Sequence, residues 1–208
     1  MSFEQPLPDE PPRSRMAERT EETRAALVAA ARELFAERGY AAVGTEEIVR
    51  AARLTRGALY HHFTGKEDLF RAVYEELEQE IVQRIAQGAS GAADPLEGLR
   101  LGTRLWLDAC EDPAVQRIAL LDAPAVLGWE QWREIGQRYA FGLVQAELQL
   151  AIDAGQIDPQ PVEPLAHMLL GAIDEAGMLI ARADDAGETR REVAVLVDRL
   201  LDAFLRRS

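Results

Sequence analysis

Residues 45–66 read TEEIVRAARLTRGALYHHFTGK, and this stretch predicts two short helices joined by a tight turn. Thr45 suits the N-cap of the first helix, with Glu46 and Glu47 in its first turn, where the helix dipole favours acidic side chains. Thr55 suits the cap of the second helix, which runs over about residues 56–62 and turns Leu59 inward. Two helices of this length with so short a connection predict a helix-turn-helix.

The outward face of the second predicted helix is polar. Its hydroxyl, guanidinium, phenol and imidazole groups can reach phosphates and base edges without exposing a large apolar patch. The residues on this face are Thr55, Arg56, Tyr60 and His61.

Residues 48–69 resemble the DNA-binding signature of the tetracycline-repressor (TetR) family of bacterial regulators. The matching positions are Ala51-Ala52, Thr55, Gly57, Leu59-Tyr60-His61-His62-Phe63 and Lys66-Glu67-Asp68-Leu69. One position departs, because Arg53 stands where the family usually has glycine. If the backbone is left-handed there, a non-glycine residue costs on the order of 1 kcal/mol. Either Arg53 recovers that cost through a phosphate contact, or the turn differs.

The resemblance implies binding to a double-stranded DNA operator through this motif. Lys66 would open the following helix, where an ammonium and the backbone N–H groups can both meet a phosphate. The predicted DNA-contacting residues are Thr45, Arg53, Thr55, Arg56, Gly57, Tyr60, His61 and Lys66.

The composition of the 208-residue chain predicts a helical protein of one or two domains, because alanine, leucine, arginine and glutamate are abundant and aromatic residues are few. No run of about 18 apolar residues occurs, so we expect no membrane span. The N-terminus lacks the apolar core of a signal peptide, which predicts a cytoplasmic protein. The single Cys110 fits a reducing compartment.

The net charge of −13 is unevenly distributed. Residues 13–66 hold ten Lys and Arg against seven Asp and Glu, a net charge of +3, whereas residues 67–208 carry −13 and residues 1–12 carry −3. A basic segment on an acidic body orients that segment toward DNA. The acidic body also serves solubility, and the two interpretations are compatible.

Breaks in the helical pattern predict three segments. We expect a disordered tail over residues 1–19, a helix-turn-helix domain with a long linker helix over residues 20–87, and a helical domain over residues 95–208. Asp94-Pro95 and Asp112-Pro113 each begin a helix, and residues 122–124 break one. The linker helix, residues 66–87, is the predicted mechanical connection between the two domains.

The last two predicted helices, residues 163–182 and 188–206, predict a homodimer. The first is apolar over most of its surface, so it must be covered on more than one side. Gly171 and Gly177 inside this helix indicate close helix approach. Two copies of the hairpin can form a four-helix bundle. The predicted dimer surface consists of Ala172, Ala176, Leu196, Leu200 and Phe204.

The C-terminal region carries aromatic residues and a polar pair, His167 and Asp174, on an apolar helix. Such polar groups are satisfied by internal hydrogen bonds, by a contact across the dimer, or by a ligand in a cavity. The resemblance favours a cavity for a small-molecule effector. The predicted lining residues are Trp106, Cys110, Trp129, Trp132, Tyr139, His167, Asp174 and Met178.

The sequence therefore predicts an all-α, two-domain, homodimeric transcriptional regulator. It is expected to bind a palindromic operator and to dissociate from it when a small-molecule effector binds. The resemblance favours repression over activation. No glycine-rich phosphate loop, paired-cysteine metal site or Ser/His/Asp constellation is present, so we expect no enzyme, cofactor or metal. The alternative is a helical small-molecule-binding protein or enzyme that keeps the three-helix module as a scaffold.

Overall fold

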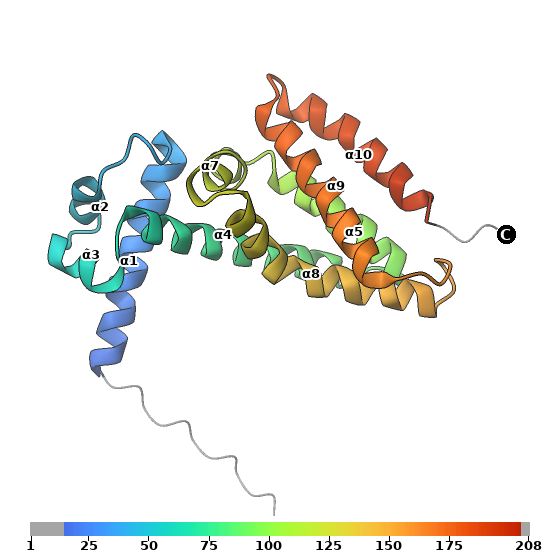
Figure 1. Cartoon of the computed structure of the whole chain (residues 1–208), viewed down its shortest axis with the longest axis horizontal. Helices are drawn as coiled ribbons and strands as arrows, with labels where there is room; N and C mark the ends of the chain where they lie inside the picture. Colours follow the sequence, from blue (N-terminus) through green and yellow to red (C-terminus); the bar gives the residue numbers. More distant parts are fainter. Residues whose placement is uncertain (1–14, 205–208) are drawn as a thin grey trace, which may run out of the picture.

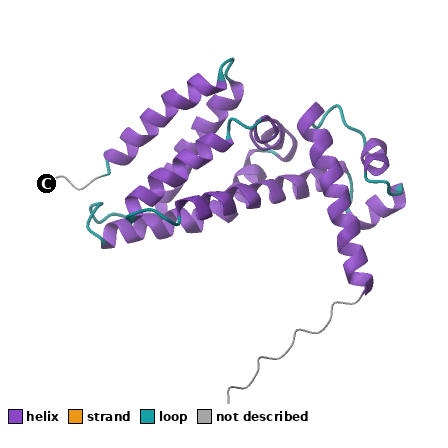
Figure 2. Cartoon of the chain, turned by 180° about the vertical axis from the view of Figure 1, so that it is seen from behind, coloured by secondary structure: helices purple, strands orange, loops and turns teal. Residues whose placement is uncertain are grey.

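The computed structural model describes residues 15–204, and within them every regular element is a helix (Figures 1 and 2). The predicted all-α fold is confirmed. The elements are α1 (Arg15–Arg38), α2 (Thr45–Ala51), α3 (Arg56–His62), α4 (Lys66–Ala89), α5 (Pro95–Ala109), α6 (Pro113–Val115), the π-helical segment η1 (Gln116–Asp122), α7 (Ala123–Leu127), α8 (Trp129–Asp153), α9 (Val162–Arg182) and α10 (Ala186–Asp202).

Helices α1, α2 and α3 form a small head at one end of the molecule (Figure 1). Helix α1 begins at Arg15, so the predicted disorder of residues 15–19 is wrong; residues 1–14 of the predicted tail lie outside the described residues. The helix ends before Gly39, whose φ of +78° is the left-handed conformation that glycine adopts without strain. The core of the head includes Leu27, Phe35, Ile48 and Leu59, which are fully buried.

The caps of the two short helices differ in part from the prediction. Thr45 is the first residue of α2 and Gly44 is its N-cap, with the Gly44 N–H donating to Glu47 Oε2 at 3.2 Å. The predicted N-cap at Thr45 is therefore wrong by one residue. Thr55 caps α3 as predicted, because its hydroxyl accepts the Ala58 N–H at 3.2 Å. Ile48 and Val49 form the buried face of α2, whereas Ala51 is exposed.

The turn between α2 and α3 is left-handed at Arg53, where φ is +56°. The chain folds back on itself there, since the Leu54 N–H donates to the Val49 carbonyl at 2.8 Å. The Arg53 side chain is exposed, and its backbone has the conformation that the sequence resemblance associates with glycine.

The other helices form the body. Helix α4 runs out of the head and packs against α5 and α8, while α9 and α10 form an antiparallel hairpin packed on α8 and α5 (Figures 1 and 2). Asp94 caps α5 as predicted, its carboxylate accepting the Glu97 N–H at 3.0 Å. Helix α10 ends at Asp202 rather than near residue 206.

The predicted break at residues 122–124 does not occur. The chain continues from α6 through η1 into α7, and the Ala123 N–H donates to the Ile118 carbonyl five residues earlier. A proline inside an α-helix lacks an N–H and clashes with the carbonyl four residues before it. The wider π-helical turns carry the chain into Pro124 at the start of α7.

The head contacts the body through two routes rather than through α4 alone. The Tyr40 backbone N–H, just after α1, donates to Asp122 Oδ2 at the end of η1 with a distance of 2.7 Å. Helix α1 also packs against α6 and η1. The prediction that α4 is the mechanical connection is therefore incomplete.

Helix α9 is long and apolar enough to cross a membrane by length and composition alone, and half of its most apolar window is buried inside the protein. The core helix of a globular protein passes the same test, and α9 packs against α5, α8, α10 and η1.

We predict that Arg53→Gly raises the free energy of unfolding by about 0.5–1 kcal/mol. Glycine relieves the left-handed strain, which is of order 1–2 kcal/mol. Part of this gain is offset because glycine also increases the conformational entropy of the unfolded chain. Urea unfolding measures the change. Arg50→Gly is the matched control: Arg50 is exposed in the last turn of α2, where the same replacement should cost about 1 kcal/mol. A loss of stability in both variants would contradict the strain argument.

Candidate functional site

The outward face of α3 brings together most of the predicted DNA-contacting residues. Leu59 and Phe63 are buried and attach the helix to the head. The opposite side leaves Tyr60 46% exposed, and the other polar residues on it are also exposed. These exposed residues are Thr55, Arg56, Gly57 and His61.

Arg56 is held loosely in position by its neighbours. Its Nη1 lies 3.3 Å from Glu46 Oε1, and its guanidinium carbon lies 5.4 Å from the centre of the Tyr60 ring. Both members of the ion pair are more than half exposed. Exposed pairs contribute less than about 1 kcal/mol, so Arg56 can exchange Glu46 for a phosphate or a base edge at little cost.

Lys66 has a structural role that the sequence did not predict. Its ammonium donates to the Tyr40 and Val43 carbonyls at 3.0 Å each and lies 3.9 Å from the centre of the Tyr40 ring. The side chain thus binds the α1–α2 connection to the start of α4. Any phosphate contact by Lys66 must compete with these interactions, whereas Thr45 is half-buried and Arg53 lies exposed in the turn.

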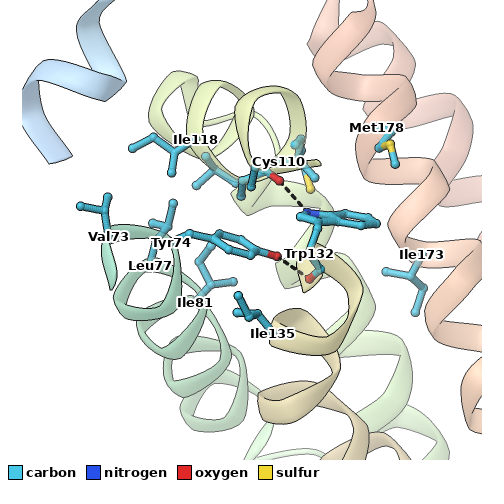
Figure 3. Packing of buried hydrophobic residues seen from close by; sticks show 14 of the residues in the cluster. Val73, Tyr74, Leu77, Ile81, Cys110, Ile118, Trp132, Ile135, Ile173 and Met178 are labelled. Atoms are coloured by element: carbon cyan, nitrogen blue, oxygen red, sulfur yellow. Dashed lines mark hydrogen bonds between the residues drawn. The ribbon is translucent and has the colours of Figure 1, made fainter. Parts of the chain in front are cut away.

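A cavity of about 220 Å³ lies in the body between α4, α5, α8 and α9. Its walls are mostly apolar, and three of the predicted residues line it: Trp106, Trp132 and Asp174. Trp132 is also fixed by hydrogen bonds, because its indole N–H donates to the Ala119 carbonyl at 2.8 Å and its own carbonyl accepts from the Tyr74 hydroxyl at 3.2 Å (Figure 3). This aromatic wall is therefore attached to both η1 and α4.

The other five predicted residues do not line the cavity. Trp129 is 54% exposed and packs against Trp132, with ring centres 4.8 Å apart and ring planes tilted by 41°. His167 packs on Phe141, with ring centres 4.5 Å apart. Tyr139 is half-buried against the core.

The remaining two, Cys110 and Met178, are buried in the packing of the body. A Cβ added at Gly177 would lie 3.0 Å from Cys110 Sγ, so glycine permits a close α5–α9 approach there, and burial raises the pKa of the Cys110 thiol. Met178 is buried and its sulfur accepts from Arg182 Nη2 at 3.5 Å. Residues sharing one face of α9 thus meet different neighbours along its length.

Polar residues from α4 and α8 line the cavity and were missed in the sequence. Tyr74 and Glu78 come from α4, and Arg133 and Gln137 from α8. Glu78 follows Tyr74 by one helical turn within the apolar stripe of α4, and this acidic residue on an apolar face is the feature that would have identified it.

The cavity holds two carboxyl groups whose pKa values are raised. Glu78 is 5% exposed, and its pKa is raised to about 7, first by burial and then by the negative charge of Asp174. Burial raises the pKa of Asp174 to about 6, while the positive charge of Arg133 acts in the opposite direction. The charge of these two carboxyl groups therefore changes near neutral pH.

We predict that the Glu78 carboxyl makes stability fall as pH rises. A carboxyl whose folded pKa exceeds its unfolded value of about 4.5 binds more protons in the folded state, so its full stability is present below pH 4.5 and is lost as pH rises through about 7. The free energy of unfolding of Glu78→Gln, relative to that of the native chain, should therefore increase by on the order of 2–3 kcal/mol between pH 5 and pH 8. Thermal unfolding at both pH values tests this, with Glu75→Gln as control, because Glu75 is a half-buried carboxylate of the same helix that forms an ion pair with Arg138. Equal pH dependence in the native chain and Glu78→Gln would contradict the assignment.

Comparison with known proteins covers both parts of the chain. The family model described as "Bacterial regulatory proteins, tetR family" matches residues 27–73, and the one described as "Tetracyclin repressor-like, C-terminal domain" matches residues 96–204. The Transposon Tn10 TetC protein of Escherichia coli is 29% identical over 145 residues, which is 70% of this chain and 73% of that protein. The transcriptional regulator AcuR of Cereibacter sphaeroides is 38% identical over 80 residues, 38% of this chain and 36% of its own.

Solved structures share the arrangement over nearly the whole chain. A TetR-family transcriptional regulator from Pectobacterium atrosepticum superposes with a TM-score of 0.82 and 35% identity, covering 94% of this chain and 99% of that one. RolR in complex with resorcinol has a TM-score of 0.70 with 23% identity, covering 88% of this chain and 89% of its own, and it supports the fold alone.

Proposed function

The chain belongs to the TetR family of bacterial transcriptional regulators, and from this premise we infer that it is a repressor that binds a palindromic operator as a homodimer and releases it when a small molecule fills the cavity. A DNA-binding, ligand-responsive regulator is the function shared by the family. The observation that carries the proposal is the joint presence of an exposed polar α3 and an apolar cavity in the body.

DNA reading is assigned to α3. A recognition helix enters the major groove while its apolar side stays packed on the head. Arg56, Tyr60 and His61 supply the side chains long enough to reach base edges, and Thr55, at the N-terminus of the helix, suits a phosphate contact. Thr45 and Arg53 flank the helix and are proposed to contact the backbone of the same half-site.

Dimerisation is assigned to an apolar surface on α9 and α10. Met168 is 71% exposed and Leu196 is 59% exposed, and Leu179, Val195 and Leu200 extend the same kind of surface. Two of the residues predicted for this surface belong elsewhere: Ala176 is buried inside its own chain and Phe204 packs partly against the core. An added Cβ at Gly171 would meet no atom within 4 Å, so the close approach predicted for it has no partner inside the chain.

The cavity is connected to the head along two paths. Helix α4 carries Glu78 and Tyr74 on the cavity wall and reaches the head directly. Leu120 and Trp132 also line the cavity, and η1 leads from them to Asp122, which accepts the Tyr40 N–H. A ligand that displaces either wall therefore acts on the position of α3, and operator and ligand must weaken each other's binding by the same factor.

The alternative, a helical binding protein or enzyme that keeps the head as a scaffold, does not explain the polar outward face of α3. AcuR and the Pectobacterium atrosepticum protein are named as transcriptional regulators, which supports a regulatory rather than an enzymatic role. We propose that this chain acts on DNA in the cytoplasm and catalyses no reaction.

We predict that Arg56→Ala and Tyr60→Ala each weaken binding to DNA from the region upstream of the gene by about 1–3 kcal/mol. The reason is the loss of base-edge contacts from the exposed face of α3. Fluorescence anisotropy at several salt concentrations measures the affinity. Arg138→Ala removes a half-exposed arginine on α8, in the body, and should leave the affinity unchanged. If none of the α3 variants weakens binding, α3 is not the reading helix.

We predict that Leu196→Glu converts the dimer into monomers, because a carboxylate cannot be buried unpaired in an apolar interface. Leu150→Glu is the matched control, since Leu150 is equally an exposed leucine but lies on α8. Sedimentation velocity at micromolar concentration distinguishes the two states. A native chain that sediments as a monomer would remove the proposed α9–α10 interface.

A further inference from the structure

The cavity contains more acidic than basic side chains. Glu78, Asp174 and Glu147 supply three carboxyl groups, and Arg133 supplies one guanidinium. Among the described residues, no basic side chain forms an ion pair with Glu78 or with Asp174. A buried carboxyl without a cationic partner is costly. The positive charge of Arg133 acts on Asp174, whereas no basic side chain of residues 15–204 acts on Glu78, so the cavity provides a place for a positive charge beside Glu78.

The walls near these carboxyl groups are aromatic. Tyr74, Trp106 and Trp132 line the same cavity, and indole and phenol faces attract cations. The volume limits the size of the guest. An apolar cavity of about 150 Å³ accepts benzene, so about 220 Å³ suits one substituted ring rather than a long chain.

We propose that the cavity binds a compact organic cation, an ammonium group carried on a hydrophobic body of about one ring. The ammonium would lie against Glu78 and Asp174, and the apolar part would lie between Trp106 and Trp132. An anionic ligand of the same size would be repelled by the two carboxyl groups. A neutral alcohol would form no ion pair with them and would therefore bind less tightly than the ammonium. The inference rests on the proposed function, in which this cavity is the effector site.

Binding of such a cation is linked to protons. Because the pKa of Glu78 is raised to about 7, a fraction of the free protein carries a neutral Glu78 at neutral pH, and an ammonium group favours its ionised form. Affinity should therefore fall as pH drops below 7. The other titratable or charged groups that line the cavity are Asp174 from α9, Arg133 and Glu147 from α8, and Tyr74 from α4. Cys110, just after α5, does not line it, but its thiol is close enough to be affected by the charges of Glu78 and Asp174.

Three compounds of one shape test the charge preference: para-tert-butylbenzylamine, para-tert-butylbenzyl alcohol and para-tert-butylbenzoate. Calorimetry on the DNA-free full-length protein at pH 8 should show the amine binding roughly tenfold to a hundredfold more tightly than the alcohol, as expected for a charge-assisted contact, and the benzoate binding most weakly. Quenching of tryptophan fluorescence, with Trp106 and Trp132 in the wall, should accompany binding.

Two variants test whether Glu78 is the carboxylate that binds the ammonium group. Glu78→Gln should reduce the preference for amine over alcohol to about threefold or less while alcohol binding persists. Glu75→Gln is an equal change of charge on α4 at a residue that pairs with Arg138 and does not line the cavity, and it should retain the preference. The native chain supplies a second readout that needs no variant: between pH 8 and pH 6 the amine affinity should fall by up to about tenfold and the alcohol affinity should not.

An amine that binds no more tightly than the alcohol at pH 8, including the case in which neither binds, overturns the inference. A preference that survives in Glu78→Gln overturns the assignment to this carboxyl. An amine that binds with the expected preference but does not release operator DNA contradicts the proposed function instead, because calorimetry on the free protein is independent of DNA.

Discussion

Helix α4 takes part in two packings at once, and the arrangement of the molecule depends on this constraint. Leu69 and Phe70, near its N-terminus, are fully buried beside the head, while Leu77 and Ile81 are buried within the body. A helix buried at both ends cannot shift at one end without disturbing the other, because packed interiors transmit displacement rather than absorb it. The reading helix and the cavity are thus mechanically joined by the same residues that stabilise the fold.

The same helix carries the chief electrostatic cost in the body. Glu78 occupies a position on the buried stripe that an apolar residue would fill at less cost in stability, and burial, which causes that cost, also raises the pKa of Glu78. Buried ionisable groups with shifted pKa values concentrate at functional sites. Glu78 shares the cavity wall with Asp174 and the aromatic rings, as the ligand-binding role proposed for it requires.

Two residues fix the geometry of the head: Arg53, which has a strained left-handed backbone, and Lys66, which hydrogen-bonds to two backbone carbonyls. Arg53 accepts a left-handed backbone that glycine would adopt freely, which keeps a positive side chain beside α3. Lys66 holds the α1–α2 connection through two carbonyls and the Tyr40 ring. The neighbouring Tyr40 N–H is bound by Asp122, so the segment that Lys66 fastens to α4 is the segment that η1 fastens to the body.

The sequence alone determined the helix-turn-helix, the caps at Thr55 and Asp94, and most helix ends, because capping residues, prolines and glycines act within a few residues of themselves. It also identified three of the cavity residues, Trp106, Trp132 and Asp174. Only the tertiary structure decided which side of each helix meets which neighbour. Helices cross one another, so residues that share one face of α9 meet different neighbours: Asp174 lines the cavity, whereas His167 packs on Phe141 of α8. The continuous π-helical segment, the clamp at Lys66 and the buried Glu78 likewise depend on contacts between residues far apart in the chain, which local periodicity does not encode.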